Sequence, residues 1–101
     1  MNKTVLQPAE LRALLRRFKE QHGEEYHLLA LGYFGSYARN EATPESDVDV
    51  VFQTDRPDLF ITAMLRQDLE TFLDQPVDVV RLREAMNPRL KARIEREATY
   101  V

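Results

Sequence analysis

The chain contains no cysteine, and only three of its 101 residues are glycine. Without thiols, disulfide-stabilised folds, thiolate metal sites and cysteine nucleophiles are all excluded. Acidic residues outnumber basic ones by 17 to 14, so we expect no direct binding of nucleic acid, which requires a basic surface. No apolar run approaches the roughly 18 residues of a membrane-spanning helix, so we expect no membrane association either.

What the chain does contain is enough apolar matter for one folded core. Hydrophobic residues make up 44% of the sequence, too large a share for a disordered segment. No repeat or Pro/Gly-rich linker divides the chain, and its length is that of one domain. The segment Met1–Glu10 lacks the basic-then-apolar layout of a secretory signal. We therefore expect a single soluble domain over residues 1–101, located in the cytoplasm.

Hydrophobic spacing predicts helices that alternate with strands. Helical periodicity covers residues 8–21, 61–73 and 88–98. Short apolar runs predict strands at 28–34, 48–52 and 77–80. The length of the first run favours a strand buried on both faces. This order predicts an α/β (α+β) fold, a sheet of three or four strands with helices packed on it.

The C-terminal end of the chain carries weaker signals. The charged residues of the last predicted helix, Lys91 to Glu97, are typical of an ordinary solvent-exposed face. Tyr100 and Val101 follow that helix and would add either an edge strand or a partner contact. His22 and His27 have no partner at metal-ligand spacing, so we interpret them as surface or capping residues.

Gly35 and Ser36 stand where a buried strand should end and a short helix begin. Backbone N–H groups at such a junction lack intrahelical partners and attract anions. Glycine would let a phosphate approach the backbone closely, the Ser36 hydroxyl would add a donor, and Arg39 would contribute positive charge or clamp the loop. The alternative is an ordinary capped turn, which is the commoner explanation for such a pair taken alone.

Asp47 and Asp49 punctuate the valine-rich run that follows. At a spacing of two they project from the same side of a strand, about 6–7 Å apart, and repel each other unless a cation lies between them. Aspartate is also depleted in strands. Such hard oxygen ligands suit Mg²⁺ or Mn²⁺. The alternative is an edge strand with alternating polar residues, and the pair alone does not decide.

Asp78 repeats this pattern inside the apolar run 77–80. A carboxylate in an apolar strand is costly unless it is paired or bound to a metal. If this strand lies beside that of Asp49, Asp78 completes a three-carboxylate cluster. Exposure at a sheet edge is the alternative, and it is the better explanation for Asp78 considered alone. Together with the first pair, the three acids favour a metal site.

The segment GSYARNEATPESDVDVVF, residues 35–52, resembles the nucleotidyltransferase superfamily typified by DNA polymerase beta. It is most similar to the minimal nucleotidyltransferases, whose pattern is G-S-x-A-R-G followed by S-D-x-D, and the order of elements extends the resemblance over almost the whole chain. Asn40 departs from the pattern, which usually has glycine there; asparagine adopts the left-handed conformation more readily than most other residues. The resemblance implies a polymerase beta-like fold with a small mixed sheet.

The resemblance also implies site residues and a function. Nucleotide-binding residues would be Gly35, Ser36, Arg39 and Ser46. Ligands of Mg²⁺ or Mn²⁺ and catalytic groups would be Asp47, Asp49 and Asp78, with Asp78 also helping to activate the acceptor hydroxyl. Family members of this size are commonly antitoxins paired with HEPN-domain toxins, and some transfer AMP from ATP to a tyrosine of that partner.

Two other functions stay open at this point. The same fold could neutralise a HEPN partner by binding alone, with weak or no catalysis. It could also transfer a nucleotide to a small-molecule hydroxyl, although family members of that kind usually carry an added helical domain for which 101 residues leave no room.

Overall fold

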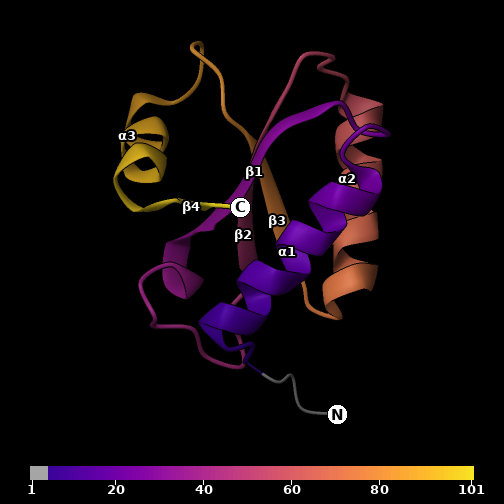
Figure 1. Cartoon of the computed structure of the whole chain (residues 1–101). Helices are drawn as coiled ribbons and strands as arrows, with labels where there is room; N and C mark the ends of the chain where they lie inside the picture. Colours follow the sequence, from indigo (N-terminus) through magenta and orange to yellow (C-terminus); the bar gives the residue numbers. More distant parts are fainter. Residues whose placement is uncertain (1–4) are drawn as a thin grey trace.

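The computed structural model of the protein describes residues 5–101, so the start of the Met1–Glu10 segment lies outside it. Helices alternate with strands as predicted (Figure 1). In chain order the elements are α1 (Pro8–His22), β1 (Leu28–Phe34), the 3₁₀ turn η1 (Gly35–Tyr37), β2 (Val48–Thr54), α2 (Leu59–Leu73), β3 (Val77–Arg81), α3 (Pro88–Glu97) and β4 (Thr99–Tyr100). None of the helices in this described part is long and apolar enough to cross a membrane.

The strands form one mixed sheet in the order β3-β2-β1-β4. β1 is antiparallel to β2 and β4, and β2 is parallel to β3. The mixed four-stranded sheet confirms the predicted fold class. The predicted edge strand at the end of the chain is also present, since Thr99 and Tyr100 pair with Tyr33 and Gly32.

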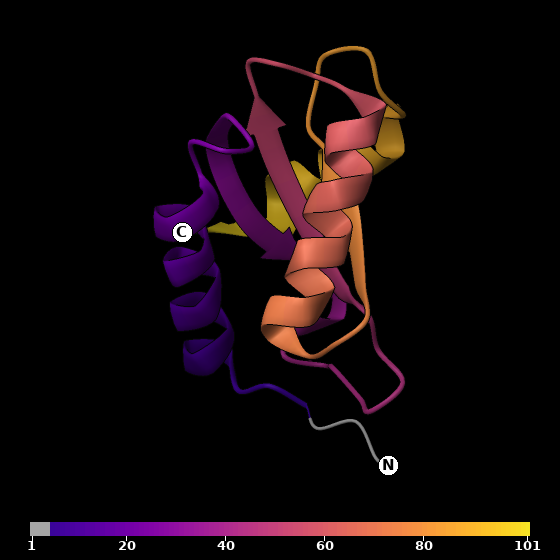
Figure 2. The same ribbon diagram turned by 90° about the vertical axis from the view of Figure 1, so that its right-hand side faces the viewer.

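Helices cover both faces of the sheet, with α1 and α2 on one face and α3 on the other (Figures 1 and 2). Val48, Val50 and Phe52 belong to the larger core, which α1 and α2 complete. Val51 packs instead with Phe34 and Ile94, the buried residue of α3. Because side chains alternate along a strand, Asp49 projects toward the α3 face.

β1 is buried on both faces over only part of its length, so that prediction is wrong for its first residues. Leu31–Phe34 are buried, but Leu29 is 61% exposed. The physical reason is a β-bulge: the register between β1 and β2 shifts between Leu28 and Ala30, so Leu29 has no partner on β2. Such a bulge interrupts the alternation of side chains and re-aims the extra residue.

Side chains and backbone angles fix the ends of α2 and α3. The Asp58 carboxylate accepts hydrogen bonds from two N–H groups of the first turn of α2, and the Asn87 side chain does the same for α3. Asp74 ends α2 in the left-handed conformation, with a φ of 53°. Pro76 then leads into β3, as the sequence predicts.

Candidate functional site

Three aspartates lie at one end of the sheet. The parallel pairing of β2 and β3 sets Asp49 directly opposite Asp78, so the condition for a shared cluster is met. Asp47 lies just outside the strand, one residue before β2 begins. Asp49 is half-buried, whereas Asp47 and Asp78 are exposed. β3 is an edge strand, so Asp78 is accessible from outside the sheet.

The electrostatics of this cluster centre on Asp49. Burial raises its pKa, the carboxylates of Asp78 and Asp47 raise it further, and the guanidiniums of Arg93 and Arg39 act in the opposite direction. The net shift is upward, which means that the ionised Asp49 is disfavoured where it lies. A bound cation would relieve that penalty. Carboxylate oxygens are the donors that Mg²⁺ and Mn²⁺ prefer, so the residues present fit such an ion.

A different group has the tightest ligand spacing over residues 5–101. Ligand atoms of His22, Glu25 and Asp68 all lie within 4.8 Å of one another, a spacing that Asp47, Asp49 and Asp78 do not reach. The His22 ring bonds Glu25 at 2.9 Å, and Asp68 accepts a hydrogen bond from the Tyr26 hydroxyl. These bonds explain the short distances without an ion. Sequence spacing could not indicate this contact, because Asp68 lies on a different helix from His22.

Gly35 leaves no space for a side chain beside Asp49. Its φ is +74°, and a Cβ at this position would overlap the Asp49 carboxylate. Glycine is therefore required both for the backbone conformation and for the space. The predicted short helix is a single 3₁₀ turn that begins at Gly35 itself. A turn of three residues has little dipole, so attraction for an anion here comes from the Gly35 N–H and neighbouring side chains.

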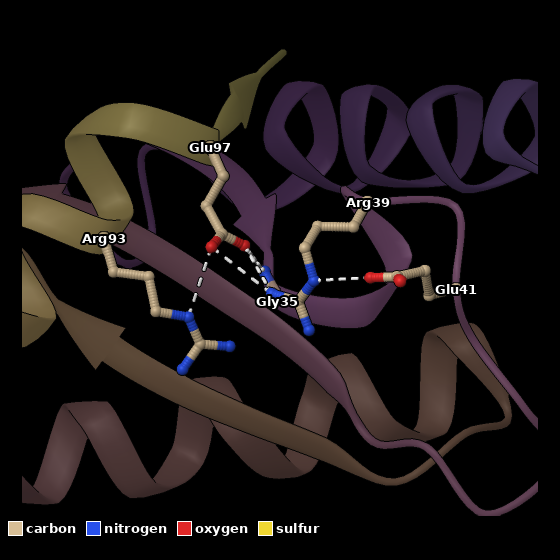
Figure 3. A network of polar contacts seen from close by, with 5 residues as sticks. All are labelled: Gly35, Arg39, Glu41, Arg93 and Glu97. Atoms are coloured by element: carbon tan, nitrogen blue, oxygen red, sulfur yellow. Dashed lines mark hydrogen bonds and ion pairs between the residues drawn. The ribbon is translucent and has the colours of Figure 1, made fainter.

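The Gly35 N–H is occupied by the carboxylate of Glu97, at the end of α3 (Figure 3). The donor–acceptor distance is 2.9 Å. Arg39 donates to the same oxygen at 2.8 Å, and Arg93 Nε donates to the other oxygen at 3.3 Å. Burial would raise the pKa of Glu97, but the Gly35 N–H and the two guanidiniums outweigh it and lower the pKa.

The Glu97 network corrects the interpretation of α3 as an ordinary charged face. The Glu97 side chain is only 13% exposed and joins α3 to the loop after β1. Arg93 and Glu97 are four residues apart on α3, a spacing at which helical side chains can pair, but we did not single out this pair from the sequence. The partner at Gly35 could not be predicted, because it lies 62 residues away.

Of the other predicted nucleotide-binding residues, Ser36 lies within η1, and Arg39 and Ser46 lie in the loop between η1 and β2. Arg39 also pairs with Glu41 at 2.8 Å. The Ser46 hydroxyl accepts the Thr43 N–H, closing a turn just before Asp47. Ser36 is half-buried, and its carbonyl accepts the Glu41 N–H. These bonds hold the loop in shape beside the aspartates.

Asn40 adopts the left-handed conformation, with a φ of 59°. This is the position at which the minimal nucleotidyltransferase pattern has glycine. The conformation accounts for the departure from the pattern, because asparagine tolerates a positive φ better than most residues.

Comparisons with known proteins agree with this geometry. The family model described as nucleotidyltransferase domain matches residues 11–101. The protein adenylyltransferase MntA of Thermococcus cleftensis is 31% identical over 93 residues, covering 91% of this chain and 93% of that protein. A solved structure named "putative minimal nucleotidyltransferase" aligns with a TM-score of 0.78 at 30% identity, covering 95% of this chain and 97% of the other. A crystal structure of a toxin–antitoxin with AMP-PNP aligns with a TM-score of 0.69 at 25% identity, covering 94% and 72%.

Proposed function

Because the chain belongs to the nucleotidyltransferase family, we propose that it transfers AMP from ATP to a tyrosine hydroxyl of a HEPN-domain toxin and acts as its antitoxin. The observation that carries the proposal is the pairing of Asp49 with Asp78 beside Gly35. It brings a carboxylate cluster to the same end of the sheet as the loop that we expect to bind the phosphates. The relationship to a protein adenylyltransferase and to a toxin–antitoxin structure with AMP-PNP supports the same reaction and class of partner.

In this reaction the acceptor oxygen attacks the α-phosphorus of ATP, the bond to the β-phosphate breaks, and pyrophosphate leaves. Asp47, Asp49 and Asp78 would hold Mg²⁺ or Mn²⁺, which when bound stabilises the negative charge that develops on the phosphates. Asp78 lies exposed on the edge strand, where an incoming hydroxyl can reach it. We assign it the further role of accepting the hydroxyl proton.

The loop after β1 would hold the triphosphate. Arg39 supplies a guanidinium that is 42% exposed, and Ser36 supplies a hydroxyl donor. The Ser46 hydroxyl accepts the Thr43 N–H and lies 3.4 Å from the Thr43 hydroxyl, and turning its proton away from Thr43 would let it donate to a phosphate oxygen. The Gly35 N–H adds a backbone donor. Together these groups would orient the leaving pyrophosphate.

An exposed apolar surface beside β3 suits a protein partner. At the start of α2, Leu59 is 89% exposed and Phe60 is 74% exposed. Leu59 also borders a groove that continues over Val79 and Val80 of β3, the strand that carries Asp78. A partner seated there would approach the aspartates from the edge of the sheet.

Neutralisation by binding alone is the second candidate, and nucleotidyl transfer to a small-molecule hydroxyl is the third. The exposed apolar surface favours a protein acceptor over a small molecule. The placing of Asp49 beside the carboxylates of Asp78 and Asp47, which repel it, favours catalysis over binding alone, because a pure binder gains nothing from that repulsion.

The test is incubation of the purified chain and a purified HEPN-domain toxin with ATP, followed by mass spectrometry of the toxin for added AMP. We expect the wild-type chain to add AMP only when Mg²⁺ or Mn²⁺ is supplied, and the Asp47→Asn/Asp49→Asn variant to add none while still co-purifying with the toxin. Asp55→Asn is the matched control, since Asp55 is an exposed acid just beyond the other end of β2.

Two results would contradict the proposal. If the double variant still protects cells from the toxin, neutralisation depends on binding alone. If the wild-type chain leaves the toxin unmodified but adds AMP to a small-molecule hydroxyl, the third candidate is correct.

A further inference from the structure

The carboxylate of Glu97 is held by the groups that the proposed function assigns to the nucleotide. Gly35 N–H and Arg39 both donate to one of its oxygens, and Arg93 donates to the other. Carboxylate and phosphate oxygens are both anionic acceptors, and guanidinium and backbone N–H groups bind either one. The Glu97 carboxylate thus lies where we expect a phosphate group of the bound nucleotide.

We propose that Glu97 is an internal stand-in for a nucleotide phosphate, displaced when the triphosphate binds, and that Arg93 is a further phosphate-binding residue. The inference rests on the proposed function and extends that function by adding two residues of α3 to the nucleotide site. Neither residue belongs to the segment 35–52 that carries the family resemblance.

The exposure of the network allows such an exchange. The side chains of Arg39 and Arg93 are 42% and 40% exposed, whereas that of Glu97 is 13% exposed. A ligand can therefore reach both guanidiniums from solvent. A triphosphate carries several negative charges against the single charge of Glu97, so it competes favourably for two cations.

Arg93 is anchored independently of Glu97. Its guanidinium carbon lies 5.7 Å from the centroid of the Phe34 ring, a distance typical of a cation–π contact. Phe34 is the β1 residue paired with Asp49. Release of Glu97 would thus leave Arg93 beside the aspartates, with its charge available to a phosphate.

A purely structural role for Glu97 and the stand-in role predict opposite changes in nucleotide affinity when Glu97 is removed. If Glu97 only positions Arg39 and the Gly35 loop, its removal disorders the site and weakens nucleotide binding. If it occupies the phosphate site, its removal ends a competition, and the apparent affinity rises by the reciprocal of the fraction of molecules in which the site had been free. The sign of the change in affinity separates the two roles.

The experiment is titration of the purified full chain with AMP-PNP and Mg²⁺ in a calorimeter. We expect Glu97→Ala to bind about tenfold more tightly than wild type, and Glu97→Gln, which keeps the shape but loses the charge, about threefold more tightly. Arg93→Ala is expected to bind about tenfold more weakly. Glu95→Ala is the control, because it makes the same change in net charge on an exposed position of α3 and should leave the affinity unchanged.

The outcomes separate this inference from the proposed function. A folded wild-type chain that does not bind AMP-PNP with Mg²⁺ would refute both. If wild type binds and the Glu97 variants bind equally or more weakly, only the stand-in role is refuted. Glu97→Gln decides the question if Glu97→Ala does not fold, and the circular dichroism spectrum of each variant establishes which case applies.

Discussion

Replacing Asp49 with asparagine is expected to raise the melting temperature of the protein while abolishing AMP transfer. Burial and the nearby carboxylates raise the pKa of Asp49, so its ionised form is less stable in the folded chain than in the unfolded chain. Asparagine has nearly the same shape and no charge, which removes the repulsion. We expect the melting temperature to rise by about 2–6 °C at neutral pH, whereas a carboxylate ligand is lost from the proposed metal site.

The stabilisation by Asp49→Asn should become smaller as the pH falls. A carboxylate whose pKa is raised by folding destabilises the folded chain above that pKa, and the penalty disappears as the pH falls toward the unfolded value. The advantage of Asp49→Asn over wild type should therefore shrink between about pH 7 and pH 4. Thermal melts followed by circular dichroism measure this, with Asp55→Asn as the control. A melting temperature lowered at neutral pH would show instead that the attraction of Arg93 and Arg39 outweighs the repulsion.

Addition of Mg²⁺ provides a second readout of the same residue. An ion that binds only the folded chain raises its stability, so wild type should gain in melting temperature when Mg²⁺ is added. Asp49→Asn should gain little. The melting temperatures of wild type and Asp49→Asn would then converge as the Mg²⁺ concentration rises. If both rose in parallel, the ion would bind elsewhere.

The sequence predicted the parts of the site that are close together along the chain. Gly35 and Ser36 were located by the strand that precedes them, and the i, i+2 spacing of Asp47 and Asp49 indicated a shared side. Asp78 needed one further condition, the pairing of β3 with β2, which the structure supplies. The reason is that local periodicity determines which way a side chain points, whereas strand order is set by packing of the whole chain.

The contact of Glu97 with Gly35 could not be predicted from the sequence. The acidic side chain of Glu97 at the end of a charged helix is indistinguishable by sequence from that of its neighbour Glu95. What distinguishes it is the short β4 strand, which pairs with β1 and thereby fixes the end of α3 beside Gly35. A two-residue strand has too little sequence to predict its partner, so a contact across 62 residues emerges only from the fold.

Gly35→Ala is expected to cause the largest loss of stability of any single substitution in the site. An L-residue with a φ of +74° costs about 1–2 kcal/mol, and the new methyl group would overlap the Asp49 carboxylate. We expect a total loss of about 2–4 kcal/mol, measured by unfolding in urea. Ser36→Ala is the control next to it: it removes a hydroxyl without changing the backbone, and should leave stability within about 0.5 kcal/mol of wild type.

A double-mutant cycle with Asp49→Ala separates the two causes of that loss. Shortening Asp49 removes the carboxylate that the methyl group introduced by Gly35→Ala would meet, but it leaves the unfavourable φ unchanged. In the Asp49→Ala background the Gly35 substitution should therefore cost only about 1–2 kcal/mol. Equal costs in the two backgrounds would mean that the loop moves away from Asp49 without penalty. In that case the position of Asp49 would be independent of the loop after β1, contrary to the contact on which the proposed site depends.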